Sequence, residues 1–151
     1  MRTIATLAEL KTLTGQEIAV SDWTSISQER VQQFADATGD QQWIHTDVER
    51  SRAESPFGGT VAHGFLTLSL LPSLMESAVT MSDVKMAVNY GLNKVRFMAP
   101  VLVGSRLRGR ISVLGVEDIA GGAQVIWQVT VEREGSDKPV CVAELISRRY
   151  S

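Results

Sequence analysis

With 151 residues, the chain has the length of one domain and enough sequence to bury a hydrophobic core. Hydrophobic residues make up 44% of it and charged residues 21%, the composition of a soluble globular protein, and the net charge of −2 argues against a nucleic-acid-binding surface. The single cysteine, Cys141, excludes an intramolecular disulfide and fits a reducing compartment.

The first third of the chain is expected to be mainly helical, because residues that favour helix ends divide it. Thr6 and Ser27 are good N-caps, and Gly39 is typical of the position just after a helix. The apolar run near the N-terminus contains Glu9 and makes a poor signal peptide, so we expect a cytoplasmic protein. The predicted elements are a helix over 7–13, an extended segment over 18–26 anchored by Trp23, a helix over 28–38, and a short helix that follows a capping box at 46–49 and ends near 53.

The segment 62–79, AHGFLTLSLLPSLMESAV, is predicted to be a buried central helix, because its apolar residues do not keep to one face. It is too short and too polar to span a bilayer comfortably, and Pro72 should kink it or split it in two. The glycine-rich turn before it lets the backbone come close to a neighbour. The first amides of a buried helix need partners, so we expect an anionic or polarised oxygen near His63 and Gly64.

The second half of the chain is predicted to be a sheet, because apolar and polar residues alternate along it. Leu107, Ile111 and Val113 oppose the arginines between them, and Val95 and Phe97 are expected on the apolar face of their strand. One dry and one wet face indicate an antiparallel sheet, and the element order indicates an α+β fold with the sheet curled around the helix. The predicted strands are 84–90, 92–98, 105–116, 123–134 and 139–150.

The chain has two histidines, and both lie close to the start of the predicted central helix. Asp40 and His45 stand five residues apart in GDQQWIH, and an acid and an imidazole on one loop can hold a water molecule between them. Alternatively, Asp40 is a turn residue after a helix and His45 is a loop histidine with satisfied hydrogen bonds. The adjacent glycine-rich turn and helix start would supply an oxyanion site, and from the residues alone both interpretations stay open.

Four segments of the sequence resemble the MaoC-like dehydratase family, also called hydratase 2, and within it the NodN-like single-hotdog branch. These are FADATGDQQWIH at 34–45, PFGGTVAHGFLTLSLLP at 56–72, NYGLNKVRFMAPVLVGSRLR at 89–108 and KPVCVAE at 138–144. The resemblance implies one hotdog domain over 1–151, with a curled antiparallel sheet wrapped around a long central helix. It also implies (R)-specific hydration of trans-2-enoyl-CoA to (R)-3-hydroxyacyl-CoA, or the reverse dehydration.

The resemblance assigns the chemistry to three residues. The family's catalytic aspartate and histidine match Asp40 and His45, and the glycine whose amide faces the thioester oxygen matches Gly64. We assign Asp40 as the base toward the attacking water and His45 as the group that orients the water and carries a proton to Cα, with the reverse division still open. In the family motif Gly-Asp-x-Asn-Pro-x-His, Gln42 and Trp43 stand here in place of Asn and Pro, which keeps the spacing between the acid and the histidine.

Five further residues are candidates for substrate binding, each with an ordinary structural alternative. Gln42 and Trp43 are expected to line the pocket or, for Trp43, to pack in the core. His63 is expected to cap the helix or to support the site. Tyr90 and Asn93 flank Gly91 and are pocket or subunit contacts unless they only mark a strand interruption.

The resemblance further implies a homodimer, because two subunits of the family together form the acyl tunnel. The expected partner is an acyl thioester of coenzyme A or of acyl-carrier protein, with no membrane or nucleic acid. We expect no cofactor, because coenzyme A belongs to the substrate, and no metal, because the sequence lacks H-E-x-x-H and paired cysteines. The alternatives are a hotdog acyl-CoA thioesterase and a non-catalytic acyl-thioester-binding protein.

Overall fold

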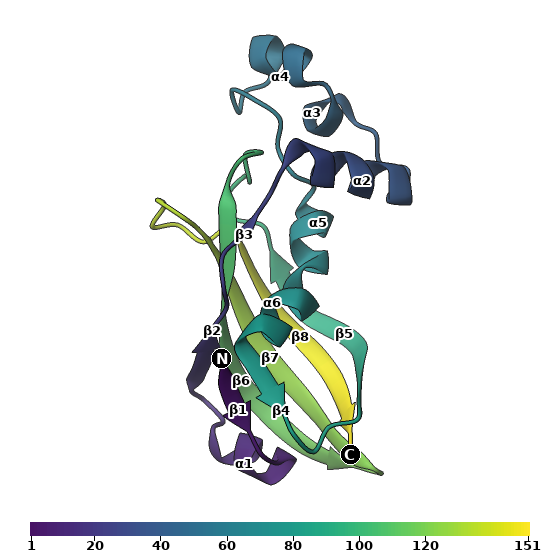
Figure 1. The fold of residues 1–151 in the computed structure, drawn as a ribbon, viewed down its shortest axis with the longest axis vertical. Coiled ribbons are helices and arrows are strands. Elements are labelled where there is room, and N and C mark those ends of the chain that lie inside the picture. Colours follow the sequence, from purple (N-terminus) through teal and green to yellow (C-terminus); the bar gives the residue numbers. More distant parts are fainter.

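The computed structural model describes all residues from Met1 to Ser151, and a six-stranded antiparallel sheet forms its main body (Figure 1). The strand order is β2-β6-β7-β8-β5, and β3 pairs with β6 beside β2. The strands are β2 Glu17–Val20, β3 Thr24–Ser25, β5 Met86–Arg96, β6 Arg106–Ile119, β7 Gly122–Arg133 and β8 Cys141–Tyr150.

Two short helices, α5 (Gly64–Ser69) and α6 (Leu71–Ala78), lie along the concave side of the sheet (Figure 1). The predicted break at Pro72 is confirmed, because proline lacks an N–H and its ring disfavours the continuing helix. The central helix is therefore two pieces, where one long helix was expected. The prediction that this helix is buried on nearly all sides was also wrong, because Phe65 is 70% exposed.

The predicted alternation is confirmed in the two central strands. Leu107, Ile111 and Val113 of β6 are fully buried, and so is Trp127 of β7, whose indole N–H donates to the Ser147 hydroxyl at 2.9 Å. These side chains pack against the inner faces of α5 and α6 to form the core. No helix is long and apolar enough to cross a membrane.

The edge strand β5 differs from its prediction in two ways. It is one strand where two were expected, with register shifts at Tyr90 and Asn93 in its pairing with β8. The expected apolar face is wrong for Phe97, which follows β5 and is 44% exposed, while Val95 is half-buried. Because β5 pairs only with β8, its other edge is left without a neighbouring strand.

The helices predicted in the first third of the chain are confirmed with small shifts. Thr6 and Ser27 accept hydrogen bonds from the amides of the helices that they cap, and Gly39 ends its helix in the left-handed conformation, at φ 82°. The fourth helix is capped by Asp47, one residue after the predicted cap at Thr46, because the Asp47 carboxylate accepts from the Arg50 amide. The remaining elements are β1 Arg2–Ile4, α1 Leu7–Thr12, α2 Gln28–Thr38, α3 Trp43–Thr46, α4 Val48–Glu54 and β4 Val79–Met81.

Three of these helices position the site. α2, α3 and α4 project beyond one end of the sheet and gather near the first turn of α5 (Figure 1). At the opposite end, β1 pairs in parallel with β4, an arrangement that the sequence did not predict. The loop between α2 and α3 and the N-terminus of α5 therefore come together at the same end of the molecule.

Candidate active site

Three side chains and one glycine meet at the N-terminal end of α5. Asp40 follows α2, His45 belongs to α3, and His63 and Gly64 begin α5. One carboxylate oxygen of Asp40 and one ring nitrogen of each histidine lie within 4.8 Å of one another. All four residues line a cavity of about 440 Å³, together with Phe34, Thr38, Phe65 and Phe97.

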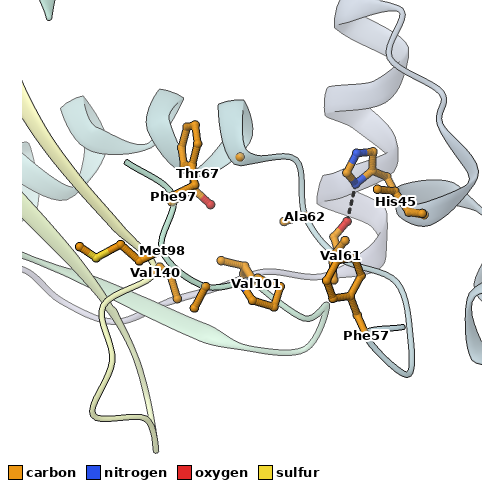
Figure 2. A pocket seen from close by; sticks show the side chains of 13 residues that line it. His45, Phe57, Val61, Ala62, Thr67, Phe97, Met98, Val101 and Val140 are labelled. Atoms are coloured by element: carbon orange, nitrogen blue, oxygen red, sulfur yellow. Dashed lines mark hydrogen bonds between the residues drawn. The ribbon is translucent and has the colours of Figure 1, made fainter. Parts of the chain in front are cut away.

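The His45 imidazole is buried and held in one tautomer. Its Nδ1 lies 2.6 Å from the carbonyl oxygen of Val61, as Figure 2 shows. Because a carbonyl oxygen only accepts, Nδ1 carries the proton and the Nε2 lone pair is free in the neutral ring. Burial lowers the pKa of His45; His63 lowers it further, and the bond to Val61 partly offsets this. The neutral imidazole is therefore favoured near pH 7.

The Asp40 carboxylate is 53% exposed and has only weak protein contacts. One oxygen lies 3.4 Å from the Gln42 amide, and the other lies 4.0 Å from Nε2 of His63. The same His63 nitrogen donates to the main-chain carbonyl of Asp40 at 3.0 Å. His63 thus ties the Asp40 loop to the start of α5 and leaves the carboxylate open to the cavity.

The two imidazoles stack on each other. The ring centroids of His45 and His63 are 3.8 Å apart, with 24° between the planes. The Phe34 ring packs against His63, and the centroids of these two rings are 4.9 Å apart. His63 makes no side-chain hydrogen bond to the helix amides, so its predicted capping role is wrong, and its role in supporting the site stays a prediction. By distance alone, the ligand atoms of Asp40, His45 and His63 could hold either a water molecule or a metal ion.

Gly64 is the first residue of α5, so its N–H has no acceptor within the helix. A Cβ at this position would lie 3.2 to 3.3 Å from three ring atoms of Phe97. The absence of a side chain therefore lets a flat group approach the amide beneath the aromatic ring. A second cavity, of about 320 Å³ and mostly apolar, shares His45, Gly64 and Phe97 with the first and extends along α5 to Thr67 (Figure 2).

The other sequence-predicted site residues contribute no side chain to the two cavities at this cluster. Gln42 is exposed, and Trp43 is half-buried beneath the Arg50 guanidinium at 4.1 Å; neither lines either cavity. Tyr90 lines a separate cavity of about 420 Å³ beside α5 and α6, and Asn93 lines neither that cavity nor the two at the site. The strand-interruption alternative fits both residues, because each falls at a register shift of β5.

Several residues of the site were missed from the sequence. Phe97 was expected in the core, and Phe34 only as part of a helix face, yet both line the cavity that holds Asp40 and His45. The Val61 contact uses a backbone carbonyl, for which no residue type gives a signal. Thr67 lines the second cavity, but the sequence did not distinguish it from the other polar residues of the predicted central helix, Ser69, Ser73 and Glu76.

Comparison with known proteins gives consistent matches. The family model described as "MaoC like domain" matches residues 9–135. A "3-hydroxyacyl-thioester dehydratase Z" from Mycobacterium tuberculosis is 56% identical over 149 residues, which cover 98% of each chain. "Nodulation protein N" from Rhizobium leguminosarum bv. viciae is 45% identical over 144 residues, covering 93% of this chain and 89% of its own. Among solved structures, an R-hydratase from Pseudomonas aeruginosa superposes with a TM-score of 0.76 at 24% identity, covering 97% of this chain and 86% of the other.

Proposed function

The chain belongs to the family of MaoC-like domains, and from this premise we propose that it adds water to trans-2-enoyl-CoA with (R) stereochemistry. The product is (R)-3-hydroxyacyl-CoA, and the same site runs the dehydration in reverse. The chain is a dehydratase/hydratase of this family, and its α+β hotdog fold is confirmed. The proposed (R)-specific hydration of an enoyl-CoA depends on the geometry of Asp40, His45 and Gly64.

The observation that carries the proposal is the presence of two hydrogen-bond acceptors and one donor around one cavity. The Asp40 carboxylate and the free Nε2 of His45 are acceptors, and the Gly64 N–H is a donor. A water molecule has two O–H groups and can donate one to each acceptor. Its oxygen lone pair then faces a substrate whose carbonyl oxygen lies on the Gly64 amide.

The reaction then follows from the polarity of the enoyl thioester. The water oxygen bonds to Cβ, the π electrons move toward the thioester carbonyl, and the Gly64 N–H stabilises the enolate-like oxygen, a contribution worth about 3 kcal/mol for such a donor. Asp40 takes the proton that leaves the water. That proton, passed on directly or through His45, is added at Cα, so one water is consumed. No cofactor or metal is needed, because coenzyme A is part of the substrate.

We further propose that the protein is a cytoplasmic homodimer. The free edge of β5 and the exposed apolar side chains around it form one continuous region, and a second copy would cover both. The exposed apolar residues on or beside β5 are Phe65, Met86, Val88, Tyr90, Leu92, Phe97 and Met98. The acyl group is carried by coenzyme A, with acyl-carrier protein as the second candidate carrier.

The direct test is spectrophotometric hydration of 2-enoyl-CoAs of graded chain length, with chiral analysis of the product. We expect loss of the enoyl absorbance without thiol release, and an (R)-3-hydroxy product. Asp40→Asn and His45→Gln should each lower turnover by about 10²-fold or more with the fold intact. Asp137→Asn, in an exposed turn, is the matched control. Near-normal turnover in either site variant would contradict the assignment of Asp40 and His45.

Two other outcomes would replace this proposal. Release of free thiol from saturated acyl-CoA indicates a thioesterase, in which water attacks the thioester carbonyl and not Cβ. Tight acyl-CoA binding without any turnover indicates a non-catalytic binding protein. The open Asp40 carboxylate and the neutral His45 favour an enzyme over a binding protein, and the similarity to a dehydratase and to an R-hydratase favours hydration over thioester hydrolysis.

A further inference from the structure

Thr67 carries a buried hydroxyl that has no hydrogen-bond partner. It lies one helical turn after Gly64 in α5, and its side chain is 2% exposed. The helical hydroxyls of Thr38, Ser69 and Ser77 donate to carbonyls of their own helices, at 2.7, 2.7 and 2.8 Å. Thr67 makes no such bond. Because a buried hydroxyl without a partner costs free energy, the position indicates a ligand for this group.

The cavity beside Thr67 offers room for such a ligand. Its volume is about 320 Å³, and the only polar side chains among the thirteen that line it are His45 and Thr67. Figure 2 shows the Thr67 hydroxyl pointing away from α5 toward this cavity. One water occupies about 30 Å³ of the liquid, so the cavity has space for a short chain of water molecules. The Thr67 hydroxyl oxygen itself exposes less than 1 Å² in this structure, so a water reaches it only when the side chains that line the cavity shift.

We propose that the Thr67 hydroxyl binds water inside this cavity, and that this water replaces the one that reacts between Asp40 and His45. The inference rests on the proposed function, because the addition of water at Cβ consumes one water molecule in each turnover. The two cavities meet at His45, Gly64 and Phe97, so water can pass from Thr67 to the reacting position. The route matters when an acyl thioester lies against Gly64 and fills the cavity that holds Asp40.

The water consumed or released in each turnover fits the proposed role of Thr67 in holding a replacement water. During hydration, the hydroxyl of the reacting water ends on Cβ and its proton ends on Cα, which leaves the position between Asp40 and His45 without water. A molecule held by Thr67 then moves into that position. During dehydration, the released water moves the opposite way. The largely apolar walls hold the water by few hydrogen bonds, which lets it move.

The test compares the wild-type protein with Thr67→Val, which removes the hydroxyl at nearly constant shape, and Thr67→Ser, which keeps it. Crystal structures should show an ordered water on the hydroxyl in the wild type and in Thr67→Ser, and none in Thr67→Val. With crotonyl-CoA, Thr67→Val should lower kcat by about tenfold with KM nearly unchanged. Thr67→Ser should keep most of the wild-type kcat. Ser73→Ala, at an exposed site on α6, is the control and should match the wild type.

The thermal midpoint of Thr67→Val should stay within a few degrees of that of the wild type, because one hydroxyl and its water are removed at nearly constant shape, so unfolding would not explain the lost turnover. The inference is overturned if no ordered water is found on Thr67, or if Thr67→Val turns over like an active wild-type protein. A wild-type protein that hydrates no enoyl thioester overturns the proposed function as well, and that result appears without any variant.

Discussion

Replacing Gly64 by alanine tests the central geometric argument about the site. The backbone of Gly64 is not in the left-handed region, so alanine can adopt its conformation at the first position of α5. The new Cβ would lie 3.2 to 3.3 Å from the Phe97 ring, closer than ordinary contact. If the Gly64 N–H binds the thioester oxygen as proposed, the methyl group would also crowd the approach of that oxygen.

The expected magnitudes separate stability from activity. Alanine gains about 0.4–1 kcal/mol by restricting the unfolded chain, and crowding typically costs about 1–3 kcal/mol. The Phe97 ring is 44% exposed and can move, so we place the crowding at the low end and expect a net loss of about 1 kcal/mol or less. Displacing the oxyanion from its donor costs about 10²–10³ in kcat, or roughly 2.7–4 kcal/mol.

The assay is hydration of crotonyl-CoA together with urea unfolding, applied to a double-mutant cycle of Gly64→Ala and Phe97→Ala. Phe97→Ala removes the ring that the new methyl group would meet, so crowding disappears in the double variant. The loss of kcat caused by Gly64→Ala should remain near 10²-fold in the Phe97→Ala background, since the methyl still blocks the amide.

Two results would refute this reasoning. If Gly64→Ala keeps kcat within about threefold of the wild type while remaining folded, the amide does not bind the thioester oxygen. If Gly64→Ala costs activity only when Phe97 is present, glycine is required for packing against the ring and not for approach of the substrate.

Three further predictions concern pH, assembly and the core. Burial lowers the pKa of His45 from 6.5, so the unfolded chain binds that proton more tightly than the folded protein does. The free energy of unfolding should therefore fall as pH drops through about 6.5, and it should fall by less in His45→Gln. Urea titrations on both sides of that pH measure both changes. Leu92→Asp on β5 should weaken a homodimer by about tenfold or more in light-scattering measurements, whereas the similarly exposed Leu114→Asp on β6 should not. Ser147→Ala leaves the buried indole N–H of Trp127 without an acceptor and should cost about 1–3 kcal/mol in chemical denaturation; a smaller loss would mean that water replaces the hydroxyl.

The fold was predictable because its main features repeat locally. The alternation in β6 and β7 sorts Leu107, Ile111 and Trp127 to the inside from sequence alone, since the sheet period is two. Capping residues and Pro72 gave the boundaries of α1, α2, α5 and α6 to within one or two residues. The short helix α3 was expected as part of a loop, because no side chain caps it. The exposure of Phe65 and Phe97 could not be predicted, because it depends on β5 being an edge strand, which is a property of strand order and not of local pattern.

For the site, the sequence by itself determined which chemical groups are present: an acid and an imidazole at a fixed spacing, and a glycine at the start of a buried helix. Only the tertiary structure decided their states. The Val61 carbonyl selects the tautomer of His45, the stacked His63 anchors the loop of Asp40, and Phe97 lies against Gly64. These contacts join backbone groups and residues far apart in the chain, and such contacts leave no pattern in the order of residue types.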